Sequence, residues 1–178
     1  MKCTLIIIFL NFLLIQSIQS QETYNPIVQD FGGIFDIPHA SVKPDANQEY
    51  KIVIDVVSGP KMPHELNPAI NNVARLLNLH GIAGVPEQQM DVVLAIHGEA
   101  TDAVLNNESY ESKYDMANPN VLLLAALEKA GVKITVCGQS LIGHRITADQ
   151  VLGSVEIATS MLTTVSSYQM KGYAFFRF

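Results

Sequence analysis

The sequence predicts one α/β domain with a flavodoxin-like, three-layer α/β/α architecture and a five-stranded, mostly parallel sheet. Short apolar runs rich in Val and Ile alternate with segments whose apolar residues recur at helical spacing. Gly and Pro separate most of these segments. Strands joined by helices run parallel, and right-handed crossovers place the helices on the faces of the sheet.

Residues 1–20 have the pattern of a secretory signal peptide. Lys2 precedes an apolar stretch over residues 5–15, and the small residues Ser17 and Ser20 follow it. The apolar stretch is shorter than the ~20 residues that span a bilayer, so cleavage near Ser20 is favoured over a retained anchor. We therefore expect a periplasmic or secreted protein with no stable membrane insertion after cleavage.

Residues 21–49 predict an extended N-terminal arm, because five Gly and Pro residues interrupt any regular element there. The arm has too many apolar side chains for a solvated tail, among them Val28, Phe31 and Ile34. It is therefore expected to pack on its own domain or on a neighbouring subunit.

The α/β domain is expected over residues 50–178 and begins with a near-continuous β-branched run, residues 50–57, which is typical of a buried parallel strand. Asn67 and Pro68 can cap and open a helix that Gly81 ends. Residues 91–96 predict a second strand. Residues 101–116 are polar and are interpreted as a loop with one helical turn at residues 103–106.

The same alternation continues to the end of the chain. Asn118 and Pro119 open a helix that Gly131 closes, and residues 132–136 form a third strand. Residues 147–150 have capping-box spacing and predict a short helix ended by Gly153. A fourth strand over residues 155–158, a helix from Ser160 through Tyr168 and a final strand over residues 173–178 complete the fold.

Charge and cysteine content restrict the function. The formal net charge is −6, and loss of Lys2 with the signal peptide brings it to −7, which disfavours binding to nucleic acid. Of the two cysteines, Cys3 leaves with the signal peptide and Cys137 remains without an intramolecular partner. A lone thiol in an oxidising compartment is buried and inert, paired between chains, or kept for reactivity.

The candidate site lies where three predicted strands end, because open parallel sheets bind ligands beyond those ends. Cys137, followed by Gly138 and Gln139, ends the third strand, where helix amides favour a thiolate. His97, before Gly98, could supply a proton or a positive charge, or simply satisfy loop hydrogen bonds. Glu99 could orient His97 or line the pocket, or it could be a solvated loop carboxylate. His144 could add positive potential near Cys137 together with Arg145, or it could be a surface residue.

Residues 131–140, GVKITVCGQS, together with the His97-Gly98-Glu99 strand end and the closing residues 172–176, resemble the DsrE/DsrF-like family over about residues 50–178. The resemblance implies a homo-oligomer. It also implies that Cys137 could carry sulfur as a persulfide between a donor and an acceptor protein. The signal peptide, the arm and the lack of a second cysteine differ from the cytoplasmic relay members.

The sequence also bears on three other functions. A metal site is not predicted, because Cys137, His97, His144 and Glu99 lack the close paired spacing of a zinc motif. No cofactor is predicted either, since the chain has neither a dinucleotide-binding nor a P-loop fingerprint. A non-catalytic oligomeric binding or assembly module with a structural Cys137 stays open, as does the question of whether the protein is an enzyme.

Overall fold

The computed structural model describes residues 22–178, so the predicted signal peptide lies outside the described residues. One sheet has the strand order β4-β3-β2-β1-β5, and all four neighbouring pairs are parallel. The strands are β1 (Tyr50–Val56), β2 (Met90–Ile96), β3 (Lys133–Cys137), β4 (Glu156–Ala158) and β5 (Ala174–Arg177). The predicted five-stranded parallel α/β fold is confirmed.

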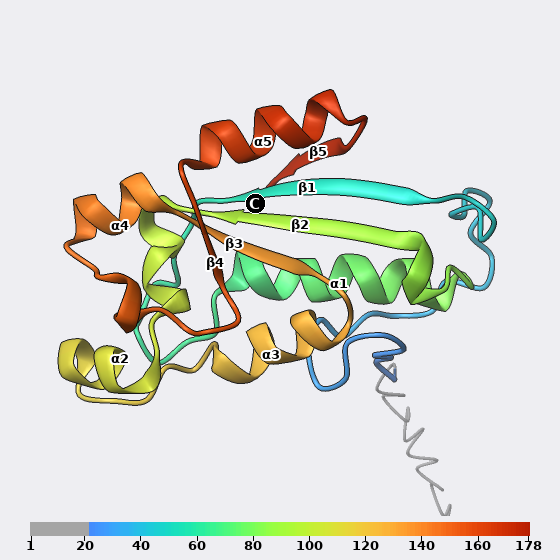
Figure 1. Ribbon diagram of the computed structural model, residues 1–178. Coiled ribbons are helices and arrows are strands. Elements are labelled where there is room, and N and C mark those ends of the chain that lie inside the picture. The colour runs from blue at the N-terminus through green and yellow to red at the C-terminus, as the bar shows by residue number, and fades with distance from the viewer. Residues whose placement is uncertain (1–21) are drawn as a thin grey trace, which may run out of the picture.

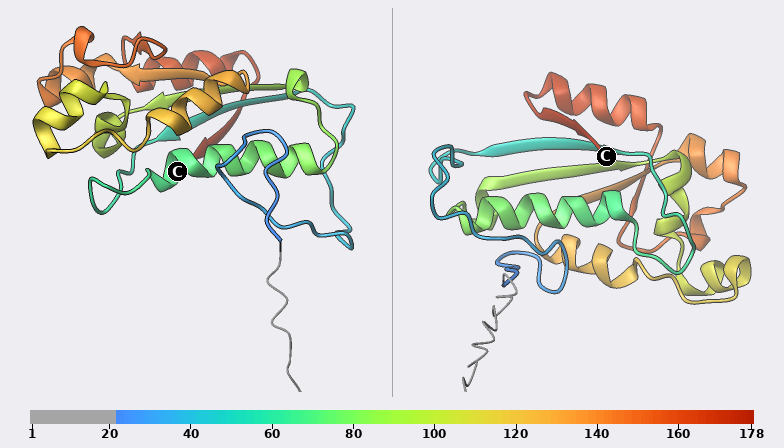
Figure 2. Two further views of the ribbon diagram at one scale, coloured as in Figure 1. Left: turned by 90° about the horizontal axis from the view of Figure 1, so that it is seen from below. Right: turned by 180° about the vertical axis from the view of Figure 1, so that it is seen from behind.

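Helices cover both faces of the sheet, which gives the three layers. Helices α1 (Pro68–Ile82) and α3 (Val121–Lys129) lie on one side, and α5 (Met161–Met170) lies on the other (Figure 1, Figure 2). Helices α2 (Asn107–Tyr114) and α4 (Gly138–His144) lie near the carboxyl ends of the strands (Figure 1). Because the chain crosses to the α5 side only after β4, the ends of β3 and β4 adjoin a topological switch point.

Alternate side chains of each strand point to opposite faces, and the two faces differ in character. Ile52, Ile54 and Val56 of β1 are buried in the main core with α1 and α3. Val53 and Asp55 are also buried but face the α5 side. The α1 side is therefore the main apolar core, whereas the α5 side also accommodates buried polar groups.

The N-terminal arm packs on its own domain, one of the two arrangements expected from the sequence. Asn78, fully buried on α1, accepts hydrogen bonds from the backbone N–H groups of Ile27 and Val28 and donates to the carbonyls of Val28, Phe31 and Gly32. Ile34 of the arm is fully buried as well. One asparagine side chain thus holds a turn of the arm against α1.

The prediction of a loop over residues 101–116 was wrong. A 3₁₀ helix spans Gly98–Val104, and α2 follows it. Tyr110 is the single buried residue of α2, so the helix has no apolar periodicity. It is held instead by the Asn106 side chain, which accepts from the Ser109 N–H, and by the Tyr110 hydroxyl, which donates to the Pro63 carbonyl.

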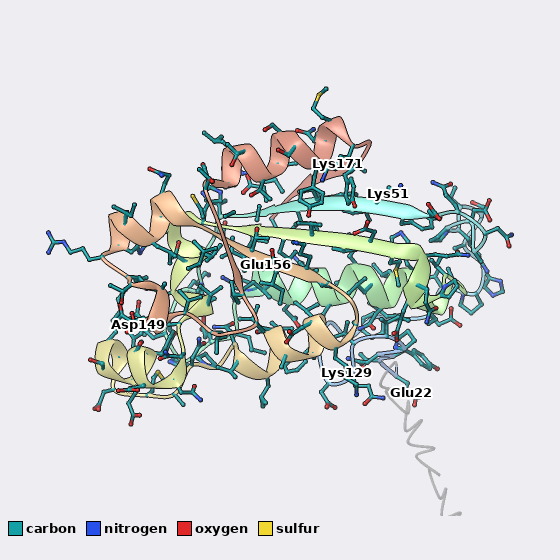
Figure 3. The ribbon with its side chains drawn as sticks, viewed as in Figure 1. Glu22, Lys51, Lys129, Asp149, Glu156 and Lys171 are labelled. Carbon is teal, nitrogen blue, oxygen red and sulfur yellow. The ribbon has the colours of Figure 1, made fainter. Side chains whose placement is uncertain are left out.

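Other boundaries differ by smaller amounts. The short helix after β3 is the 3₁₀ helix Ala148–Gln150 with the expected capping box, and α4 is an additional helix directly after Cys137. A further 3₁₀ helix, Glu87–Gln89, precedes β2. Charged side chains such as Lys129, Asp149 and Glu156 lie at the outside of the molecule (Figure 3). Within residues 22–178, no helix is both long and apolar enough to cross a membrane.

Candidate functional site

Cys137 is the last residue of β3 and directly precedes α4. Its side chain points to the α5 side, where Sγ lies 3.9 Å from Oγ of Ser160, within hydrogen-bonding range for sulfur. Ser160 also caps α5, because its Oγ accepts from the Leu162 N–H. Cys137 is only 5% exposed, but Gly138, Ser140 and Ser160 around it are partly exposed, so the thiol lies just below the surface.

The surroundings of Cys137 favour the thiolate. Burial by itself raises the pKa of the thiol. Hydrogen bonds from the backbone N–H groups of Met161 and Ser140 and from the hydroxyls of Ser140 and Ser160 lower it by more in total. The net result is a pKa of Cys137 below the ordinary value of a cysteine thiol.

Gly138 allows this convergence of donors. A Cβ atom at Gly138 would lie 2.9 Å from the Ala158 carbonyl oxygen, closer than real Cβ atoms approach backbone. The absence of a side chain therefore lets the start of α4 lie directly beside the end of β4, which leads to Ser160. The next residue, Gln139, is exposed and borders an open groove of about 430 Å³ that Leu141, Ile142 and Ile157 also line.

His97 follows β2 and is held by an aspartate of the neighbouring strand. Its Nε2 lies 2.6 Å from Oδ1 of Asp55, whose side chain is 5% exposed. Nε of Arg177, on β5, lies 3.4 Å from Oδ2 of the same carboxylate. Each oxygen of this buried carboxylate therefore has a cationic or hydrogen-bonding neighbour, which compensates its loss of water.

The register of the sheet makes His97 and Cys137 neighbours. Ile96 pairs with Val136, so His97 and Cys137 follow on neighbouring strands and their side chains start from the α5 face, although no hydrogen bond joins them. The Gly98 N–H donates to Oγ of Ser140 at 3.3 Å, which ties the end of β2 to the first turn of α4.

Glu99 and His144 lie at a different site. Both line a cavity of about 360 Å³ between the loop after β1, the 3₁₀ helix Gly98–Val104 and α2; Cys137 does not line it. Nδ1 of His144 is 3.8 Å from Oδ1 of Asp102, and Lys113 Nζ is 2.7 Å from Oδ2. His144 therefore lies near Asp102 but beyond hydrogen-bonding distance, and Asp55 rather than Glu99 holds the ring of His97.

Sequence reasoning did not identify Asp55, Ser160 or Arg177 as site residues. Asp55 lies inside an apolar run, and that pattern indicates only a buried strand. A carboxylate in such a strand, beside a strand that ends in His, was the available signal. Within residues 22–178, no group of three or more His, Cys, Asp or Glu side chains is arranged to hold a metal ion.

Comparison with known proteins identifies the family. The sequence model described as DsrE/DsrF-like family matches residues 51–178, which include Asp55, His97, Cys137 and Arg177. The chain belongs to the DsrE/DsrF-like family.

Two solved structures have the same DsrE-like fold. A protein of unknown function, MTH1491, from Methanobacterium thermoautotrophicum matches with a TM-score of 0.52 and 19% identity, over 72% of this chain and 98% of that one. The ychN protein from E. coli matches with a TM-score of 0.53 and 21% identity, over 72% of this chain and 99% of that one. No curated protein matches the sequence.

Replacing Ser160 with alanine in this DsrE-like chain is expected to raise the pKa of Cys137. The change removes the hydroxyl that accepts from the neutral thiol and can donate to the thiolate, and it removes the cap of α5, so it is also expected to cost about 1 kcal/mol of unfolding free energy. The pH dependence of thiol alkylation and urea unfolding measure the two effects. Ser166→Ala is a matched control, because its hydroxyl only donates to the Thr163 carbonyl on the exposed side of α5. Equal alkylation profiles for both variants would contradict the assignment.

Proposed function

We propose that the protein is an exported sulfur carrier that holds sulfane sulfur as a persulfide on Cys137. The proposal rests on the position of Cys137 Sγ at the ends of β3 and β4, 3.9 Å from Ser160 Oγ, where nearby backbone N–H and hydroxyl groups lower the pKa of the thiol. Membership of the DsrE/DsrF-like family is consistent with a role related to sulfur relay. Export is supported by the signal-peptide pattern of residues 1–20.

The chemistry consists of two thiol exchange steps. The Cys137 thiolate attacks the sulfane sulfur of a donor such as thiosulfate, a new S–S bond forms, and sulfite leaves with the electron pair of the broken bond. An acceptor thiolate then attacks the outer sulfur, and Cys137 leaves as a thiolate again. Neither step needs an external oxidant or reductant, because the sulfane sulfur enters and leaves at the same oxidation level.

The proposal includes a homo-oligomer. The edge strands β4 and β5 are largely exposed, and Phe175 and Phe176 on β5 are about two-fifths exposed. Unpaired strand edges and exposed aromatic side chains favour association with a second copy. The same features favour the alternative, a binding or assembly module in which Cys137 is structural.

Intact mass measurement tests the proposal. The mature protein and its Cys137→Ser variant are incubated with thiosulfate or polysulfide, and the intact mass of each is measured before and after treatment with reductant. We expect a reducible increment of one sulfur atom on the native chain and none on the variant. If the native chain gains no sulfur and its thiol resists alkylation until unfolding, the carrier function is wrong and the assembly module remains.

A further inference from the structure

A row of polar side chains crosses the carboxyl edge of the sheet on its α5 face, with one residue for each strand. In spatial order they are Ser160 after β4, Cys137 on β3, His97 after β2, Asp55 on β1 and Arg177 on β5. Contacts join Ser160 to Cys137, His97 to Asp55 and Asp55 to Arg177. The register places His97 and Cys137 at the ends of neighbouring strands, on the same face of the sheet, but no hydrogen bond joins their side chains.

Asp55 determines which nitrogen of His97 carries the proton. The carboxylate only accepts hydrogen bonds, so at 2.6 Å from Oδ1 the Nε2 atom must be the donor. In residues 22–178, Nδ1 of His97 has no hydrogen-bond partner. The neutral ring thus has its lone pair on Nδ1, the nitrogen that Asp55 does not contact.

The charged and titratable groups near His97 are few. Asp55 faces it from β1, Cys137 lies beside it on β3, and Arg177 on β5 contacts the far oxygen of Asp55. Helix α5, which covers this face, has no charged residue between Met161 and Met170, and His144 of α4 is turned to Asp102. Asp55 is therefore the negative group in direct contact with the ring.

We propose that Asp55 is a positioning residue for the sulfur-transfer site, and that Nδ1 of His97 accepts the Cys137 proton. This inference rests on the proposed function. When Cys137 attacks a sulfane sulfur, the proton passes from Sγ to Nδ1 through one water, and the imidazolium is stabilised by Asp55. When an acceptor thiolate later removes the sulfur, the stored proton returns from Nδ1 to the leaving Cys137 Sγ, which regenerates the neutral ring and maintains proton balance.

The decisive variant is Asp55→Asn. The amide of asparagine can donate a hydrogen bond to Nε2. The ring proton then moves to Nδ1, so Nδ1 can no longer accept the Cys137 proton. We expect sulfur loading from thiosulfate at neutral pH to slow by at least about tenfold, while the final one-sulfur adduct still forms. The loading rate is also expected to depend less on pH, because the base that accepts the Cys137 proton is lost.

Asp91→Asn is the matched control. Asp91 also lies on the α5 side of the sheet, but at the start of β2, where the Tyr173 hydroxyl donates to it. The same change of carboxylate to amide there is expected to leave the loading rate and pH profile as in the native chain. Equal slowing in both variants would mean that a general loss of stability, not the position of His97, causes the effect, and would overturn the inference.

A second measurement does not depend on the variant folding. Nitrogen chemical shifts of the His97 ring in the native protein are expected to show the proton on Nε2 in the neutral form. A proton on Nδ1, or Asp55→Asn protein that loads sulfur at the native rate, would overturn the inference and leave the carrier function intact. Failure of the native protein to load any sulfur would instead overturn the proposed function.

Discussion

Replacing Asn78 with leucine is expected to lower the free energy of unfolding by about 3 to 5 kcal/mol, because several buried backbone groups of the arm lose their partner together. Two N–H groups, of Ile27 and Val28, donate to Oδ1, and three carbonyls accept from Nδ2. Leucine has a similar size but offers none of these bonds. Urea unfolding followed by circular dichroism measures the change.

Asn71→Leu is the control for Asn78. Asn71 lies on the same helix and accepts a single bond from the arm, from the Gly32 N–H at 2.9 Å. A loss of about 1 kcal/mol is expected there. If the two variants lose the same stability, the arm is not held by Asn78 in solution, and its packing on α1 would need to be revised.

Replacing Gly138 with valine is expected to reduce the reactivity of Cys137 at neutral pH by about tenfold. The new Cβ would be 2.9 Å from the Ala158 carbonyl oxygen and 3.6 Å from that of Thr159, so α4 and the end of β4 must separate. Ser160 and Met161 follow directly and would move away from Sγ, which raises the pKa of the thiol. The rate of alkylation by a neutral reagent measures the change.

Gly143→Ala provides the comparison for Gly138. Gly143 is in the same helix, α4, and a Cβ there meets no atom within 4 Å. Alanine is expected to leave thiol reactivity unchanged and to stabilise the helix slightly. Native reactivity in the Gly138→Val protein would show that close approach of α4 to β4 is not what activates Cys137.

The fold was predictable from the sequence because its main elements have strong hydrophobic patterns. Helix α1 begins at Pro68 after its Asn67 cap, as expected. Asn67 accepts from the first free N–H groups of the helix, and proline has the backbone angle that a first helical residue needs. Helix α2 was not predictable in the same way, because its only buried residue is Tyr110 and its position depends on contacts with Pro63, which is distant in sequence. The strand order also depends on long-range pairing of the short strand β5 with β1.

The candidate site was predictable only in part. The position of Cys137 at the end of a parallel strand follows from the sequence, because strand ends in such sheets adjoin helix starts. Its donors Ser160 and Met161 come from the next strand–helix connection, and Asp55 comes from a strand two positions away in the sheet. Contacts of this kind depend on register and strand order, which local periodicity does not encode.

Titration of the thiolate shows whether the fold activates Cys137. Because the pKa of Cys137 is lowered in the folded chain, folding stability should increase as pH rises from the folded to the unfolded pKa and decrease as pH falls through the folded pKa. Ultraviolet absorbance of the thiolate is recorded against pH for the native protein and for the same protein in urea, with Cys137→Ser subtracted. We expect a lower midpoint in the native protein; a native midpoint equal to or above that of the unfolded chain would mean that the fold does not activate Cys137.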